Sequence, residues 1–136
     1  MGLAHSPRIV RDGLVLYLDA ANIKSYPGSG TTWTDISGKD YDGTLINGPT
    51  FSSDNLGCVV FDGSNDTVHG VHNSELNLRN DVTVECWFRR TGSRGDWVRV
   101  FGKGDSTNRT YGLWYHVNAN YFLYQRYGPS NMNVLI

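Results

Sequence analysis

The stretch VTVECWF, residues 82–88, carries the clearest structural signal in this chain of 136 residues. Its side chains alternate between an apolar set and a more polar set, as they do along a β-strand whose two faces meet different surroundings. The apolar set is Val82, Val84, Cys86 and Phe88, and the other set is Thr83, Glu85 and Trp87. We therefore expect a strand here with one face turned to a core.

Short β-rich runs of the same kind recur along the chain, separated by clusters of Gly, Asn, Asp and Ser. No segment has sustained helical periodicity, and about eight strands at this spacing are typical of a sandwich or barrel. The further runs are 14–18, 43–46, 58–61, 67–71, 98–101, 111–117 and 121–127. We predict one all-β domain over residues 1–136, with residues 1–8 as an N-terminal arm.

One of these runs and one of the turns between them carry a more detailed expectation. LVLYL, residues 14–18, is apolar on both faces, which suits a central strand. DGSND, residues 62–66, reads as a tight turn, so 67–71 is expected to pair with 58–61.

Composition and charge exclude several classes of function. The 12 Lys and Arg nearly balance the 13 Asp and Glu, so no basic field is present to attract a nucleic acid. No apolar run is long enough to span a membrane, and MGLAHSP, residues 1–7, lacks the apolar core of a signal peptide. Cys58 and Cys86 are expected to be reduced and buried, with a disulfide as the alternative.

Four motifs in order resemble the laminin G-like branch of the concanavalin A-like lectin and glucanase superfamily. The resemblance covers roughly residues 9–117. The motifs are GLVLYLD at 13–19, DISG at 35–38 followed by DGTL at 42–45, VFDGSND at 60–66, and VTVECWF at 82–88. The resemblance implies a jelly-roll β-sandwich that binds a ligand or partner or serves as a structural component.

A narrower resemblance concerns YPGSGTTW, residues 26–33. It is similar to the versions of this domain found in structural proteins of tailed bacteriophages, especially marine ones. This implies a virion protein, such as a tail or fibre component or a capsid decoration, assembled in the host cytoplasm with other virion proteins.

The chain departs from the family pattern at two places. KDY, residues 39–41, replaces a turn that is usually rich in Gly and Asn, and the family's domain usually continues beyond Ile136. We expect either an abbreviated sandwich, a fragment, or a C-terminal segment 128–136 that pairs with a neighbouring subunit, because an unpaired apolar edge is a liability for a monomer. The pairing alternative favours a homo-oligomer.

Aromatic side chains provide a candidate glycan platform, because flat apolar rings stack on sugars. Trp97 is singled out because it follows Gly95 and Asp96 in a predicted loop, where no strand requires a large apolar residue. The candidates are Trp33, Trp97, Trp114, Tyr115 and Tyr124, although tryptophans on alternating strands are more often core. A lectin-like module for host-surface recognition is therefore the alternative function.

The turn at 62–66 has a second interpretation as a calcium loop. Asp62, Asn65 and Asp66 offer the oxygen ligands that calcium prefers, but Asn and Asp are equally suited to a turn without metal. We favour the turn and expect no cofactor, with calcium as the alternative.

A glycoside hydrolase is the second alternative function, because the same architecture hosts such enzymes. Glu75 and Glu85 are the only glutamates, and no cluster of acids like that of sandwich glucanases is present. We therefore expect no enzyme activity. Positive charge is concentrated near one loop, at Arg89, Arg90, Arg94 and Arg99. These residues are interpreted either as a solvated strand end or as the rim of a partner-binding surface.

Overall fold

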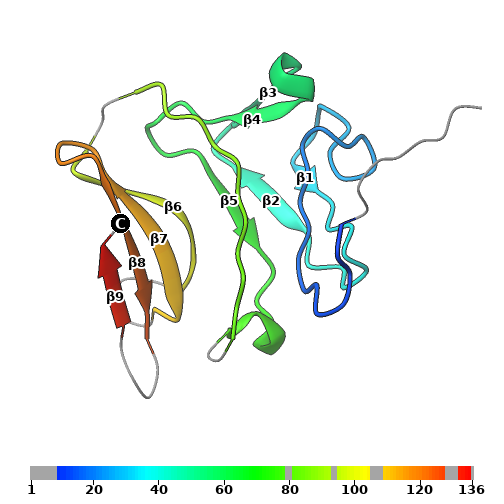
Figure 1. Ribbon diagram of the computed structural model, residues 1–136. Helices are drawn as coiled ribbons and strands as arrows, with labels where there is room; N and C mark the ends of the chain where they lie inside the picture. The colour runs from blue at the N-terminus through cyan, green and yellow to red at the C-terminus, as the bar shows by residue number, and fades with distance from the viewer. Residues whose placement is uncertain (1–8, 79–80, 93–94, 105–108, 128–131, 136) are drawn as a thin grey trace, which may run out of the picture. The chain divides into compact units, whose positions relative to one another are not determined.

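The computed structural model describes residues 9–78, 81–92, 95–104, 109–127 and 132–135. Its contacts divide the chain into two compact units, Met1–His72 and Asn73–Ile136. The described residues of each unit form short antiparallel strands and one single-turn 3-10 helix (Figure 1). The predicted all-β class is confirmed, whereas the jelly-roll connectivity and the single domain over 1–136 stay predictions. The expected arm at 1–8 lies outside the described residues.

The first unit holds two small sheets. β1 (Thr32–Trp33), β2 (Gly43–Ile46) and β5 (Thr67–Gly70) form one, in the order β1-β2-β5. β3 (Thr50–Ser52) and β4 (Cys58–Val60) form the other, with the 3-10 helix η1 (Asp54–Leu56) between them. Because β5 pairs with β2 and β4 with β3, the predicted pairing of 67–71 with 58–61 is wrong.

Asp35 organises the interior of this unit. It is only 4 % exposed, and its carboxylate accepts hydrogen bonds from Tyr17 N at 2.8 Å and from Tyr41 N at 3.0 Å. Ser37 donates to it twice, from its backbone N at 2.9 Å and its hydroxyl at 2.7 Å. Asp35 N in turn donates to Asp42 Oδ1 at 2.8 Å. One buried carboxylate therefore joins three loop segments that have no ladder of their own.

The expected central strand at 14–18 is not formed within the described residues. This segment is tied down at Tyr17 instead, whose N binds the Asp35 carboxylate and whose carbonyl accepts from Ile36 N at 2.9 Å. Its apolar pattern indicated burial correctly in part, since Leu14, Val15, Tyr17 and Leu18 are half-buried. A strand also needs a partner ladder, and apolar pattern alone does not supply one.

The second unit begins with the 3-10 helix η2 (Ser74–Leu76) and contains one four-stranded sheet. β6 (Trp97–Lys103), β7 (Tyr111–His116), β8 (Tyr121–Arg126) and β9 (Met132–Leu135) follow one another in space as in sequence. The register shifts between Arg99 and Phe101, which marks a bulge in β6. The predicted strands at 98–101, 111–117 and 121–127 are confirmed within a residue or two at most ends.

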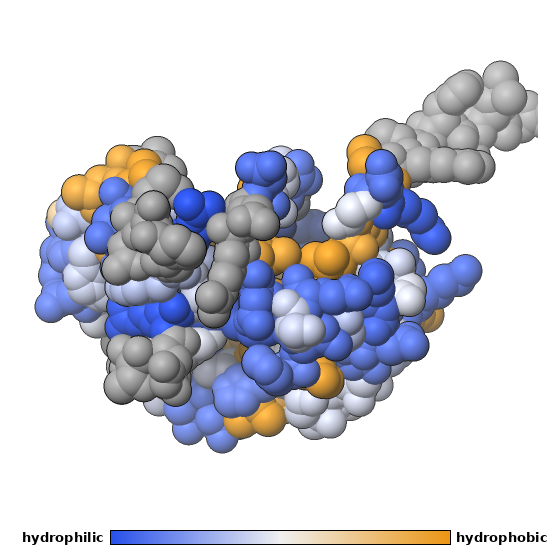
Figure 2. All heavy atoms as spheres, turned by 90° about the horizontal axis from the view of Figure 1, so that it is seen from below, coloured by the Kyte–Doolittle hydropathy of each residue, from blue (hydrophilic) through white to orange (hydrophobic). Residues whose placement is uncertain are grey.

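Few large apolar side chains are fully buried. Tyr26, Leu45, Leu76 and Tyr115 form the buried apolar set of the described residues. Leu56 is 88 % exposed and Trp87 is 100 % exposed. Figure 2 shows apolar side chains reaching the surface among hydrophilic ones on the face that it draws. The chain therefore leaves much apolar surface available for contacts.

Candidate functional site

The sheet β6–β9 has two faces of different chemistry, set by side-chain alternation along paired strands. The first, the crevice face, carries Phe101, Leu113, Tyr115, Phe122, Tyr124 and Arg126. The second, the arginine face, carries Trp97, Arg99, Trp114, His116, Tyr121 and Gln125. Each face offers a separate candidate site.

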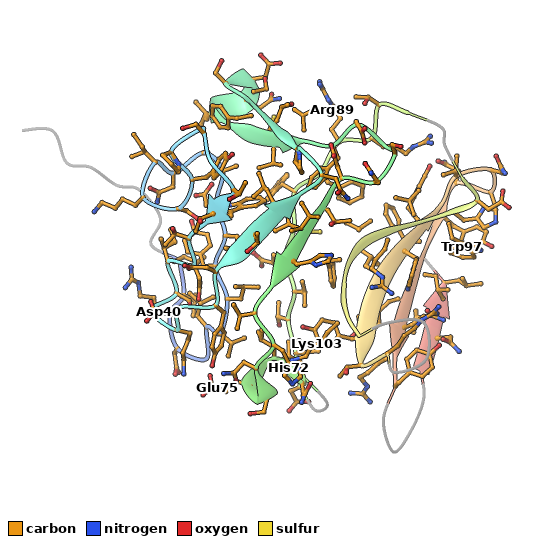
Figure 3. The ribbon with its side chains drawn as sticks, turned by 180° about the vertical axis from the view of Figure 1, so that it is seen from behind. Asp40, His72, Glu75, Arg89, Trp97 and Lys103 are labelled. Atoms are coloured by element: carbon orange, nitrogen blue, oxygen red, sulfur yellow. The ribbon has the colours of Figure 1, made fainter. Side chains whose placement is uncertain are left out.

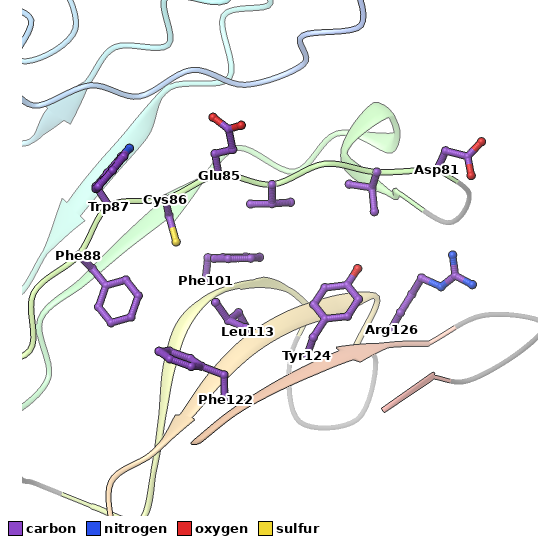
Figure 4. Close-up of a pocket in the computed structure, with 12 residues that line it drawn as sticks. Asp81, Glu85, Cys86, Trp87, Phe88, Phe101, Leu113, Phe122, Tyr124 and Arg126 are labelled. Carbon is purple, nitrogen blue, oxygen red and sulfur yellow. The ribbon is translucent and has the colours of Figure 1, made fainter. Parts of the chain in front are cut away.

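A crevice of about 840 Å³ lies between the crevice face and the extended segment 81–88. Cys86 and Phe88 point from this segment toward the sheet, whereas Glu85 and Trp87 point away from it (Figure 4). The Phe88 ring meets Phe122 edge-on, with ring centroids 5.9 Å apart. Although the Cys86 side chain is exposed, its partial desolvation beside the crevice raises the pKa of the thiol.

The segment 82–88 keeps the predicted alternation but is not a strand. Cys86 and Phe88 face the sheet as expected, yet none of the described residues pairs with the segment in a β-ladder. The strand prediction for 82–88 is therefore wrong, because alternation reports which side meets apolar surroundings and not whether a partner backbone is present. The result is an extended segment that packs by side chains alone.

The arginine face is centred on Trp114. The Arg99 guanidinium lies 4.5 Å from the centroid of the indole, and the Arg109 guanidinium lies 5.1 Å from it. Such cation–π contacts hold the cations against the ring face. Arg99 also donates to the Gly104 carbonyl at 3.0 Å, and Arg109 donates to Gln125 Oε1 at 3.3 Å.

Glycines make this arrangement possible. Gly102 and Gly112 pair directly across β6 and β7 on the arginine face. A Cβ on Gly102 would lie 3.6 Å from Arg99 Cδ, and one on Gly112 would lie 3.2 Å from Trp114 Nε1. The absence of these side chains lets the indole and the Arg99 stem lie flat over the strands.

An aromatic cluster occupies the neighbouring end of the same face. Trp97, at the start of β6 (Figure 3), packs edge-on against His116 at 4.6 Å and against Tyr121 at 5.6 Å between ring centroids. Trp97 is 41 % exposed, and beside it Asn118 donates to Asp96 Oδ1 at 2.7 Å. The expectation that Trp97 lies in a loop is wrong, since it begins a strand and pairs with His116.

The five aromatic residues of the predicted glycan platform do not lie on one surface. Trp33 belongs to β1 in the first unit. Trp97 and Trp114 lie on the arginine face, whereas Tyr115 and Tyr124 lie on the crevice face. His116, Tyr121 and Arg109 complete the arginine face and were not predicted. The side-chain alternation of the predicted strand 121–127 could have placed Tyr121, but Arg109 has no local signal.

The acidic turn at 62–66 caps its own backbone. Asp66 Oδ2 accepts from Asp62 N at 2.9 Å, and Asp62 Oδ1 accepts from Ser64 N at 2.7 Å. The Asn65 carbonyl accepts from the Asn47 side chain at 2.7 Å. Asp66 Oδ1 is buried without a hydrogen-bond partner among the described residues. These bonds are those of the favoured turn, and calcium binding stays an untested alternative.

The remaining candidates are placed as follows. The Glu85 carboxylate points away from the crevice (Figure 4), and Glu75 is the middle residue of η2. Cys58 and Cys86 are both free, as expected, but Cys58 is only half-buried and Cys86 is exposed, so their predicted burial is wrong. Within the described ranges, no helix is long and apolar enough to cross a membrane.

Comparison with protein-family models, curated proteins and solved structures finds no match to this chain.

Proposed function

We propose that this protein is a structural component of the particle of a tailed bacteriophage, in the tail, a fibre or the capsid decoration, and that it acts through protein–protein contacts without catalysis. The resemblance at residues 26–33 supports the phage assignment. The observation that carries the contact role is the extended segment 82–88, which exposes Trp87 completely. The occupant that we propose is an extended strand of a neighbouring subunit.

The chemistry of the segment favours a strand as its partner. An extended backbone offers a row of N–H and C=O groups, and such groups usually find partners in a ladder. Strand addition supplies those hydrogen bonds, while pockets for alternate side chains supply specificity. Trp87 is fully exposed, and tryptophan is one of the residue types most enriched among the few residues that carry most of the binding energy of an interface.

The C-terminal strand β9 pairs on one side with its own chain. β9 pairs with β8 of its own chain, with Tyr124 opposite Val134 and Gln125 opposite Asn133. The other side of β9 is an edge of the sheet, so pairing of segment 128–136 with a neighbouring subunit stays a prediction. The contact between subunits that we propose is instead at 82–88.

Replacing Trp87 by Ser is expected to weaken self-association by at least about tenfold, because a large apolar anchor is lost from the contact. Sedimentation velocity over a range of protein concentrations measures this change. Leu56→Ser is the matched control, since it removes another largely exposed apolar side chain, from η1, and should leave association unchanged.

Thr83→Pro tests the strand geometry separately, because proline removes one backbone donor from the segment. We expect it to weaken association as Trp87→Ser does. A parent protein that stays monomeric at high concentration, and that mass spectrometry does not find in purified phage particles, would overturn the proposal.

Glycan binding is the second candidate, and the cluster of Trp97, His116 and Tyr121 favours it. A partly exposed ring beside the Asp96–Asn118 pair combines a stacking surface with polar groups that can bind hydroxyls. Trp97→Ala is expected to abolish any signal on a glycan array, whereas Trp33→Ala should not change it. A parent protein without signal, with and without calcium, would contradict this candidate.

A further inference from the structure

Two buried N–H groups on the arginine face have no acceptor. They are Trp114 Nε1 and Arg109 Nε. Among the described residues, four buried side-chain N or O atoms have no hydrogen-bond partner, and these are two of them. They belong to side chains in direct contact, since the Arg109 guanidinium lies against the Trp114 ring. Buried donors nearly always have an acceptor, so these two mark the contact of Arg109 with Trp114 as a place where the described residues leave hydrogen bonds unmade. Because neither atom is exposed to solvent, an external acceptor reaches them only when the Arg109 side chain moves.

The charge around these donors identifies the acceptor as an anion. Arg99 and Arg109 both lie against one indole, and no carboxylate contacts either guanidinium within the described part of the chain. Residues 73–136 contain eight of the 12 Lys and Arg but only five of the 13 Asp and Glu. A carboxylate matches the planar fork of a guanidinium and can accept from several donors at once.

The geometry points to a carboxylate-binding site formed by Arg99, Arg109 and Trp114, which takes an acidic side chain of a partner protein. β6 lies at the edge of the sheet and pairs only with β7 among the described strands. Trp97, Val98 and Arg99 on this edge are exposed. A strand added there would carry its side chains alongside Arg99, in reach of the site. This inference rests on the proposed role in protein contacts but uses a different surface from segment 82–88.

Arg99 also explains how the site selects its partner. A charged residue on an edge strand discourages pairing with a like strand of another copy. An acidic strand of a partner is attracted by the same charge. Arg99 therefore disfavours pairing with another copy of β6 and favours pairing with an acidic strand.

Two peptides that differ only in charge test the site on the full chain. The probes are an extended peptide of alternating Thr and Glu and the same peptide with Gln in place of Glu, titrated with tryptophan fluorescence as the readout. We expect the Glu peptide to bind at least about tenfold more tightly at low salt, and to weaken as salt is raised.

Arg99→Gln and Arg109→Gln should each weaken binding of the Glu peptide by about tenfold, and Arg99→Lys should weaken it less because the charge is kept. Arg90→Gln is the matched control. It removes one positive charge and one cation–π contact, 4.9 Å from the Tyr115 ring on the other face, and should leave binding unchanged.

Three outcomes would overturn the inference. They are equal binding of the two peptides, an effect of Arg90→Gln as large as that of Arg99→Gln, and tighter binding of oligogalacturonate than of the Glu peptide. The last would assign the site to an acidic sugar. Loss of self-association in Trp87→Ser with no preference for the Glu peptide would overturn this inference alone and leave the proposed function standing.

Discussion

Asp35→Ala is expected to lower the free energy of unfolding of the first unit by about 3–4 kcal/mol, because donors lose their shared acceptor inside the fold. The carboxylate accepts from Tyr17, Tyr41 and twice from Ser37. Without it, these loop segments keep only a few hydrogen bonds to one another, such as those from Ile36 N to the Tyr17 carbonyl and from the backbone N of residue 35 to Asp42. Urea unfolding, with amide hydrogen exchange at β2 and β5 to locate the change, measures the effect.

The same carboxylate predicts how stability depends on pH. Burial by itself would raise the pKa of Asp35, but hydrogen bonds donated by Ser37, Tyr17 and Tyr41 outweigh it and hold the pKa below the ordinary value of 3.8. A depressed folded-state pKa stabilises the fold above pH 3.8, and this stabilisation is lost as the pH falls from there through the folded-state pKa. Asp35→Ala should therefore flatten the acid side of the stability profile.

Asp54→Ala is the matched control for both measurements. It removes an exposed carboxylate at the start of η1 and should change stability by no more than about 0.5 kcal/mol. If Asp35→Ala and Asp54→Ala were equally mild, the central role of Asp35 would be refuted.

Gly102→Ala is expected to destabilise the second unit by about 2–3 kcal/mol. Its added Cβ would lie 2.8 Å from the Tyr111 carbonyl oxygen and 3.0 Å from Gly112 Cα, and both are backbone atoms that no rotamer change can move. Strands β6 and β7 must separate to admit the methyl group. Thermal unfolding measures the loss, and hydrogen exchange at β7 should show it locally.

Gly70→Ala in β5 is the control, because a Cβ there meets no heavy atom within 4 Å. This change should be neutral or stabilise the chain by up to about 1 kcal/mol, since alanine restricts the unfolded chain more than glycine does. Comparable destabilisation by both variants would mean that lost backbone freedom, and not the close approach of β6 to β7, sets the cost.

The sequence predicted most strands but not their partners. Runs such as 111–117 and 121–127 were located because alternation and flanking turns mark a half-buried strand locally. The pairing of β5 with β2 was missed because it depends on which distant strand presents a matching edge. The segments 14–18 and 82–88 show the same limit, since both have a strand-like pattern and neither has a ladder partner among the described residues.

The candidate site was predicted in composition but not in arrangement. Four of the five aromatic residues proposed for one platform belong to β6–β8, yet register divides them between opposite faces. A shift of one position along a strand moves a side chain to the opposite face of the sheet. A small uncertainty in register therefore divides residues that were predicted to share one surface. The contact of Arg109 with Trp114 could not be foreseen, because it depends on how the chain enters β7 and not on spacing.

The order of strands in the second unit has a consequence for how the protein folds. In β6–β9 each strand pairs with the one that follows it in the chain, so each closure spans a short loop. In the first unit, β2 must find β5 across the segment that forms β3 and β4. Short closures cost less chain entropy and form faster than distant ones. The sheet that carries both candidate sites can therefore form early, while the loops joined by Asp35 are still closing.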